Sequence, residues 1–409
     1  MSLDMAKYAP ALKEYYTNTA VENMVYKDHP ALAMVKKMEM FFGESLPLPT
    51  IYGNPQGRSA NFSKAKANKT SSVLAKFSLT RFKDYSLASI DNETAEASEN
   101  DKGAFLRAMT VEIDGALQAA TNSAASDMFG TGSGKIGQIS ALTANDGGSG
   151  NTKVELVSAE DIVYFEQGMS LTVSLTNGGG AGVKTANVAV VISVNRDQGH
   201  FHVSDAQATA ITALANDYIF VDGDYDSKMP GFAAWIPKTD AEAVTTFLGV
   251  DRSKDPTRLG GIRFDGSAMP IEEALIKAAS RVQREGGNPD VVFLSYDKYS
   301  DLEASLGSKV QYVQPTANGR ADISFRGIKL NTNKGSMTVL ADSYCPEGSA
   351  FMLTMKTWQL FSLKKMIRIL DLDGNKVLRE NDEDAVEVRV GGYKILGCNA
   401  PGWNAHISL

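Results

Sequence analysis

The chain has 409 residues, of which 43% are hydrophobic and 22% charged, and its net charge is −7. At roughly 100–200 residues per domain this length predicts two or three domains, and the composition excludes a disordered, collagen-like or disulfide-stapled protein. The acidic balance disfavours a surface that wraps nucleic acid. The N-terminal sequence has no apolar core, and no uncharged apolar stretch reaches the roughly 20 residues of a membrane span, so we expect a cytosolic product without membrane contact.

Residues 1–53 predict an N-terminal arm with short helices, because apolar residues recur there at helical spacing and prolines interrupt the pattern. Residues 54–92 predict a long two-stranded hairpin with a polar turn at 69–72. A two-stranded ribbon is at best marginally stable in isolation. We therefore expect the hairpin to lie on another surface, and we expect that surface to be acidic because the hairpin is cationic.

The charges of this region fall into two blocks. The first block has seven cations and no acid, and these cations are Arg58, Lys64, Lys66, Lys69, Lys76, Arg81 and Lys83. The second block has six acids and no cation, and these acids are Asp84, Asp91, Glu93, Glu96, Glu99 and Asp101. We interpret the cations as contacts between identical chains and the acids as their complement, because each hairpin tip in a ring of copies can lie on the next chain. Exposed ion pairs contribute only about 0.2–1 kcal/mol each, so apolar burial must supply most of the affinity.

Two further segments follow the acidic block. Residues 93–135 contain a predicted long helix at 101–129, whose apolar residues share one face and which ends at a glycine-rich turn. Residues 136–236 consist of short runs of strand-forming residues, among them 162–165, between glycine-rich loops. This spacing predicts a small β-barrel or sandwich inserted into the parent fold.

The last two segments complete the chain. Residues 237–345 alternate helix and strand, with predicted helix caps at Ser267 and Ser295, which indicates an α/β domain with a central sheet. Residues 346–409 return to long strands, two of them predicted at 385–390 and 393–398.

No motif carries an enzyme signature. The glycine pattern at 132–137 follows a helix, whereas a dinucleotide-binding loop must follow a strand and open a helix. Asp222, Asp224 and Asp226 alternate like calcium ligands, but the glycine and the closing glutamate of a calcium loop are missing. We therefore predict no catalytic residue, no cofactor and no metal ion.

The order of these elements resembles that of the major capsid proteins of tailed bacteriophages, which have the fold of the Hong Kong 97 phage capsid. The similarity is strongest in LKEYYTNTAVENMVYKDHPALAM, PTIYGNPQGRSANFSKAKANKTSS, KFSLTRFKDYSLASIDNETAEAS, GAFLRAMTVEIDGALQAATNSAASDMFGTGSG and AVEVRVGGYKILGCNAPGWNAHISL. The resemblance implies an α+β fold with an N-terminal arm, an extended loop at 54–92 and a spine helix of the peripheral domain within 93–135. It further implies an inserted small β-barrel-like domain at 136–236, an axial domain at 237–345, and peripheral-domain strands with a C-terminal return at 346–409.

In function, the resemblance implies a non-enzymatic coat protein that assembles into hexamers and pentamers of an icosahedral shell. The shell would enclose double-stranded phage DNA without sequence specificity. The implied partners are further copies of the chain, a separate scaffolding protein and a portal protein, with a decoration protein left open. The implied location is the virion capsid, after assembly in the cytoplasm of the host bacterium. Two alternatives stay open: an encapsulin-like shell that encloses cargo in a bacterial cell, and a hydrolase that uses the 136–236 segment.

Overall fold

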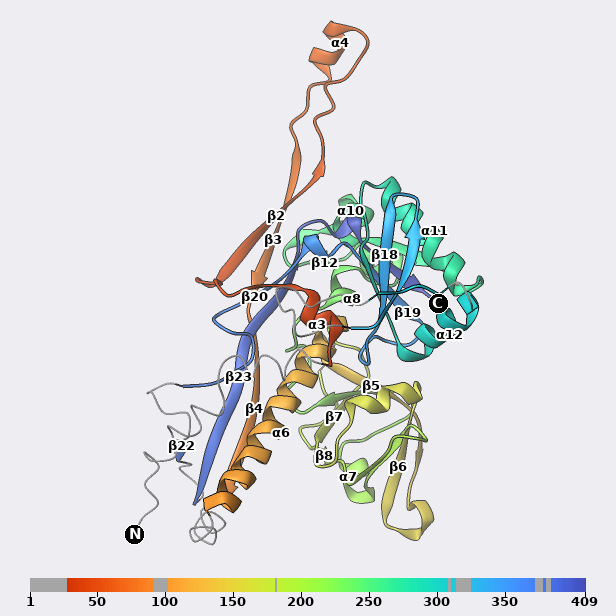
Figure 1. The fold of residues 1–409 in the computed structure, drawn as a ribbon. Coiled ribbons are helices and arrows are strands. Elements are labelled where there is room, and N and C mark those ends of the chain that lie inside the picture. Colours follow the sequence, from red (N-terminus) through yellow and green to blue (C-terminus); the bar gives the residue numbers. More distant parts are fainter. Residues whose placement is uncertain are drawn as a thin grey trace.

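The computed structural model describes residues 28–91, 102–180, 182–307, 310–313, 325–371, 378–379 and 384–409. Figure 1 shows a narrow hairpin that projects from a body with a long helix. The described residues of the body form one sheet of six strands, two sheets of seven strands and one two-stranded sheet. The architecture is α+β, as the sequence predicts. None of the helices in the described residues is both long and apolar enough to cross a membrane.

The hairpin consists of β2 (Ser45–Gly53) and β3 (Val73–Thr80), which pair antiparallel and with no third strand. A short helix, α4 (Phe62–Ala67), lies at its tip. The predicted hairpin is therefore present, but its first strand lies before residue 54, and 58–68 form no strand. Pro47 and Pro49 are tolerated in β2 because no second neighbouring strand requires their missing N–H groups.

The first sheet of the body, named the peripheral sheet after the predicted domain, is built around one long strand. Its members are β1 (Lys36–Met38), β4 (Phe82–Asp91), β20 (Trp358–Ser362), β21 (Arg368–Ile369), β22 (Leu378–Arg379) and β23 (Ala385–Cys398). β23 is continuous where we predicted two strands, because Gly391 and Gly392 stay extended within it and pair with β4. The helix α3 (Pro30–Met34) precedes β1.

The helix α6 (Lys102–Phe129) runs alongside β4 and β23, which confirms the predicted long helix. At 1.5 Å per residue it is about 42 Å long. The apolar side chains Ile113, Leu117, Ala120, Ala124 and Met128 are all buried. Their spacing of three and four residues places them on one face, as the sequence predicts.

The second sheet, named the insertion sheet, has the strand order β8-β7-β11-β5-β6-β10-β9. Its strands are β5 (Lys135–Thr143), β6 (Asn151–Leu156), β7 (Ser170–Ser174), β8 (Ala189–Val190), β9 (Ser193–Asn195), β10 (His200–Ser204) and β11 (Tyr218–Val221). It has a hydrophobic core of its own, in which Phe165 stacks on Phe201, and α7 (Asp205–Ala210) packs against it. The predicted strand at 162–165 is wrong, because Ala159–Tyr164 form a 3₁₀ helix that buries Ile162.

The third sheet, named the axial sheet, has the order β14-β24-β19-β15-β18-β17-β16. Its strands are β14 (Ile262–Asp265), β15 (Val291–Leu294), β16 (Tyr312–Val313), β17 (Gly327–Thr332), β18 (Gly335–Ala341), β19 (Ser349–Leu353) and β24 (Ala405–Ser408). β19 and β24 thus belong to this sheet, although the sequence analysis placed their segment with the peripheral strands. Hydrophobic residues of α11 (Ile271–Arg284) and α12 (Tyr296–Leu306) share the core of this sheet.

The two predicted caps have different outcomes. Ser295 caps α12 by accepting a hydrogen bond from the N–H of Lys298. Ser267 caps no helix: it donates its hydroxyl to Asp265, and Pro270 occupies the N-cap position of α11. Short elements connect the sheets: α8 (Phe232–Trp235), α9 (Asp240–Ala243), β12 (Thr246–Phe247), β13 (Val250–Asp251) and α10 (Pro256–Gly260).

Candidate assembly interface

The base of the hairpin is part of the hydrophobic core. Phe77 is completely buried, and its ring lies edge-on to that of Trp235 at 4.9 Å between centroids. The hydroxyl of Thr50 donates to the backbone carbonyl of Asn399 at 3.1 Å. Arg258 donates to the carbonyl of Tyr52 at 2.6 Å. These contacts fix the lower half of the ribbon to the body, so the ribbon leaves the body in a defined direction.

Arg81 lies where the hairpin meets β4. Its guanidinium donates to the carbonyls of Phe41 and Gly43, at 2.9 and 2.5 Å, and lies 4.8 Å above the Phe41 ring. This arrangement ties the turn before β2 to the end of β3. Arg81 therefore anchors the hairpin within its own chain, and its contact with a neighbouring chain stays a prediction.

The tip of the hairpin, residues 54–72, is exposed to solvent apart from the partly buried Ala65. The amide oxygen of Asn61 accepts from the N–H of Lys64 and so begins α4. The predicted contact cations of the tip are exposed, and no ion pair joins them to another described residue; they are Arg58, Lys64, Lys66 and Lys69. Lys76 and Lys83 are also exposed, on β3 and β4.

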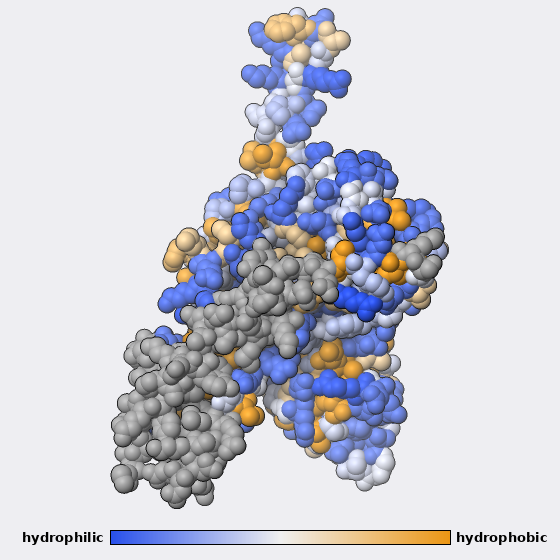
Figure 2. Space-filling view, viewed as in Figure 1, coloured by the Kyte–Doolittle hydropathy of each residue, from blue (hydrophilic) through white to orange (hydrophobic). Residues whose placement is uncertain are grey.

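The hairpin also presents apolar side chains to solvent. Strand side chains alternate between faces, so the residues opposite the buried Leu48 and Phe77 point outward. Ile51 and Leu74, which pair across the ribbon, are 63% and 58% exposed, and Phe62 on α4 is 82% exposed. Figure 2 shows the protruding hairpin as a mostly polar stalk with apolar groups on it. The sequence analysis expected apolar burial at the contact but did not identify these residues, although alternation in β2 and β3 could have indicated them.

The predicted acidic complement is only partly described. Asp84 lies in a buried cluster of charges within its own chain, where it pairs with Lys228 and Lys394. The side chain of Asp91 lies outside the described residues, as do Glu93, Glu96, Glu99 and Asp101. Their role in an interface stays a prediction.

The ion cluster comprises Asp84 on β4, Asp127 on α6, Asp224 and Lys228 from the loop after β11, and Lys394 on β23. The Nζ atom of Lys394 lies 3.0 Å from Asp84 and 3.1 Å from Asp127, and only 2% of this side chain is exposed. Lys228 lies 3.2 Å from Asp84 and 3.3 Å from Asp224. Four segments that are distant in the sequence therefore meet through their charges.

The cluster shifts the pKa values of its carboxyl groups in opposite directions. Burial alone would raise the pKa of Asp84, but the charges of Lys394 and Lys228 outweigh this effect and lower that pKa to about 2. Burial raises the pKa of Asp127, which is enclosed on all sides, and it also raises the pKa of Asp224. Asp84 therefore stays ionised while Asp127 is the easier group to protonate.

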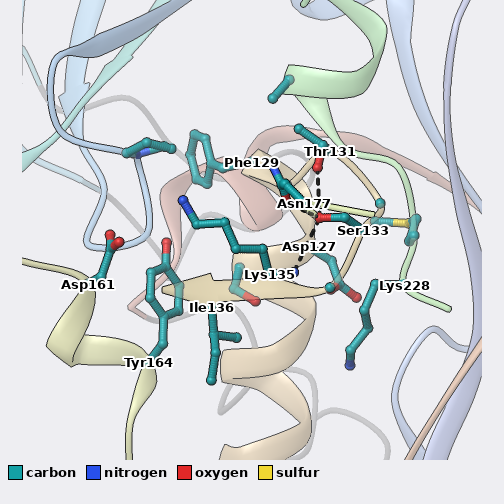
Figure 3. A pocket seen from close by; sticks show the side chains of 17 residues that line it. Asp127, Phe129, Thr131, Ser133, Lys135, Ile136, Asp161, Tyr164, Asn177 and Lys228 are labelled. Carbon is teal, nitrogen blue, oxygen red and sulfur yellow. Dashed lines mark hydrogen bonds between the residues drawn. The ribbon is translucent and has the colours of Figure 1, made fainter. Parts of the chain in front are cut away.

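A cavity of about 180 Å³ lies beside the ion cluster, between the end of α6 and the start of the insertion sheet. Figure 3 shows Asp127 and Lys228 on one side of it and Asp161 and Tyr164 on the other. Burial raises the pKa of Asp161 to about 6. The hydroxyl of Ser133 donates to Asn177 at 2.8 Å and orders the glycine-rich turn between α6 and β5.

Two of the three residues that alternate like calcium ligands have side-chain partners within the protein. Asp224 pairs with Lys228, and Asp226 accepts the N–H of Gly179 at 2.8 Å. Among the described residues, no three His, Cys, Asp or Glu side chains are grouped as a metal site requires.

Comparison with solved structures defines the class of fold: the chain has the fold of a phage capsid protein. One structure that supports this is the capsid asymmetric unit of cyanophage A-1(L), with a TM-score of 0.52, 13% identity, and coverage of 96% of this chain and 94% of that one. The predicted phage major capsid fold is therefore confirmed. No protein-family model and no curated protein sequence matches the chain.

Two more distant similarities involve chains of comparable length. A structure from Mycobacterium phage Bobi gives a TM-score of 0.41 at 11% identity and covers 100% of this chain and 99% of that one. A structure of the major capsid and decoration proteins of phage G gives a TM-score of 0.41 at 7% identity, with coverage of 94% and 90%.

Proposed function

We propose that the chain is a major capsid protein that assembles with copies of itself into the hexamers and pentamers of an icosahedral phage shell. One observation carries this proposal: a ribbon anchored rigidly at its base ends in a tip that makes no contact with the body of its own chain, as far as the structure describes that body. Exposed apolar side chains on such a ribbon favour a protein partner. The match to a cyanophage capsid favours a phage shell over the encapsulin-like compartment.

The partner that best fits the tip is a second copy of the chain. A heterologous contact, in which the hairpin of one subunit lies on the body of the next, closes into a ring when the rotation between subunits allows it. The exposed Phe62, Ile51 and Leu74 supply apolar area, and the lysines of α4 supply specificity toward an acidic surface. The residues Asp91, Glu93, Glu96, Glu99 and Asp101 are the proposed complement.

The charge of the chain suits a DNA container. At a net charge of −7 the subunit has little general attraction for phosphate, so DNA can be packed into the shell and released from it. The proposed further partners are a separate scaffolding protein, a portal protein and a decoration protein, and the proposed location is the virion after assembly in the host cytoplasm. The proposed role is structural and involves no catalysis.

Reversing the tip charges tests this function. We expect the triple variant Lys64→Glu, Lys66→Glu, Lys69→Glu to fold like the wild type but to form few or no particles, because its tips are repelled by the acidic complement. Circular dichroism and thermal melting report the fold, and sedimentation with negative-stain microscopy reports the particles. A control variant reverses three exposed lysines of the body, Lys238, Lys254 and Lys364, and should still assemble. Normal particles from the tip variant would refute the proposed interface.

A further inference from the structure

The ion cluster lies at the root of the hairpin and joins it to three other parts of the fold. β4 begins at Phe82, directly after β3 ends at Thr80, so Asp84 is close to the point where the ribbon leaves the body. Through Lys394 and Lys228, Asp84 is tied to β23 and to the loop after the insertion sheet. A change in the protonation of this cluster therefore affects contacts between β4, α6 and the loop that follows the insertion sheet.

Two separate links connect α6 to the cluster. In the first, the hydroxyl of Ser123 donates to Asp84 at 2.9 Å and accepts from Lys228 at 2.7 Å. In the second, one turn later, Asp127 pairs with Lys394 on β23 at 3.1 Å. The first link depends on a carboxylate that stays ionised. The second depends on the carboxylate of Asp127, whose negative charge is destabilised by burial.

The charges of the cluster do not balance when every group is ionised. Its three carboxylates, Asp84, Asp127 and Asp224, face two ammonium groups, Lys228 and Lys394. A buried site with one excess negative charge favours the uptake of one proton. The two lysines keep the pKa of Asp84 low, whereas burial raises the pKa of both Asp127 and Asp224. Asp127 is the more deeply buried of these two, with 4% of its side chain exposed against 27% for Asp224, so we assign the proton to Asp127.

The cavity beside α6 gives water a route to this carboxyl group. Asp127 and Lys228 both line it, together with Ser133 and Asn177 (Figure 3). The cavity has a volume of about 180 Å³ and several polar side chains in its wall, so it has room for several water molecules, each of which occupies about 30 Å³ in the liquid. Protons can therefore reach Asp127 without unfolding of the subunit.

We propose that the ion cluster is a proton-responsive joint: one proton taken up by Asp127 releases the last turn of α6 from β23, while β4 stays tied to β23 and to the loop after β11. The link of α6 to Asp84 and Lys228 through Ser123 stays in place. The joint is built from contacts within one subunit, so it does not depend on the proposed assembly function.

Hydrogen exchange of the unassembled, full-length subunit tests the joint. Protection of the amides at 126–130 is measured from about pH 8 to about pH 4 and is corrected for the intrinsic pH dependence of exchange. We expect protection there to fall about tenfold on acidification, with little change at 113–121. Equal protection of the last turn at both ends of the range would overturn the proposal.

Two matched variants assign the response to one carboxyl group. Asp127→Asn keeps the shape of the side chain without its charge, so protection of 126–130 should be low at every pH. Asp161→Asn removes another carboxyl that lines the same cavity, and it should respond to pH like the wild type. A response that persists in Asp127→Asn, or that disappears in Asp161→Asn, would contradict the joint. If Asp127→Asn fails to fold, the hydrogen-exchange titration of the wild-type subunit still tests the joint by itself.

Discussion

Replacing Phe77 by alanine removes the side chain that holds the base of the hairpin in the core. The ring is completely buried between Trp235 and Phe247, at centroid distances of 4.9 and 6.4 Å. A buried Phe→Ala change costs about 3–5 kcal/mol, and the cost is highest where the neighbours cannot move into the space. Trp235 cannot move readily, because it is itself buried and its indole N–H donates to Leu396 at 3.0 Å. We therefore expect a loss of about 4 kcal/mol in the free energy of unfolding.

Urea unfolding of the subunit, monitored by tryptophan fluorescence, measures this loss. The comparison requires that the free energy of unfolding depends equally steeply on urea concentration in the variant and the wild type. Leu74→Ala on the same strand is the matched control, because Leu74 is 58% exposed in the subunit. A substitution at such a site should change stability by less than about 0.5 kcal/mol. If the two variants cost the same, the hairpin base is not held by the core and the rigid direction of the ribbon loses its physical basis.

Three further outcomes follow from individual sites. Gly134→Ala should destabilise the subunit by more than about 1 kcal/mol, because Gly134 has φ +81° and a Cβ atom would meet the backbone carbonyl of Asp224; thermal melting measures this. Burial raises the thiol pKa of Cys345, and that of Cys398 to about 12, so neither should react with a thiol reagent until urea unfolds the chain. Burial raises the pKa of Asp342 from 3.8 to about 6, so the folded state binds this proton more tightly than the unfolded state. Stability should therefore rise on acidification from about pH 6 to pH 4, and calorimetry should find that part of the rise missing in Asp342→Asn.

Sequence reasoning succeeded where a local pattern decides the structure. The buried face of α6 follows from apolar residues such as Ile113, Leu117 and Ala124, which recur every three or four positions. It failed for the first strand of the hairpin because Pro47 and Pro49 argue against a strand in general, although they are harmless in a ribbon with a free edge. The helix at the tip was missed, yet Asn61 before a run of good helix formers is a recognisable start signal.

The ion cluster could not be predicted, because its members are far apart in the sequence and single charges are typical of exposed positions. Asp84 was read with the acidic block that follows it, whereas its actual partners are Lys228 and Lys394. One signal was available: Lys394 stands inside the apolar strand that continues with Ile395 and Leu396. A lone charge in such a strand indicates a buried partner.

The central claim is that the hairpin tip is covered by another copy of the chain. Acetylation of lysines with a water-soluble reagent, quantified by mass spectrometry, tests this most directly when free subunits and purified particles are compared. We predict that Lys64, Lys66 and Lys69 lose most of their reactivity in particles, while the body residue Lys254 keeps its own. Tip lysines that react equally in both states would mean that the ribbon stands free in the shell, and the proposed interface would be wrong.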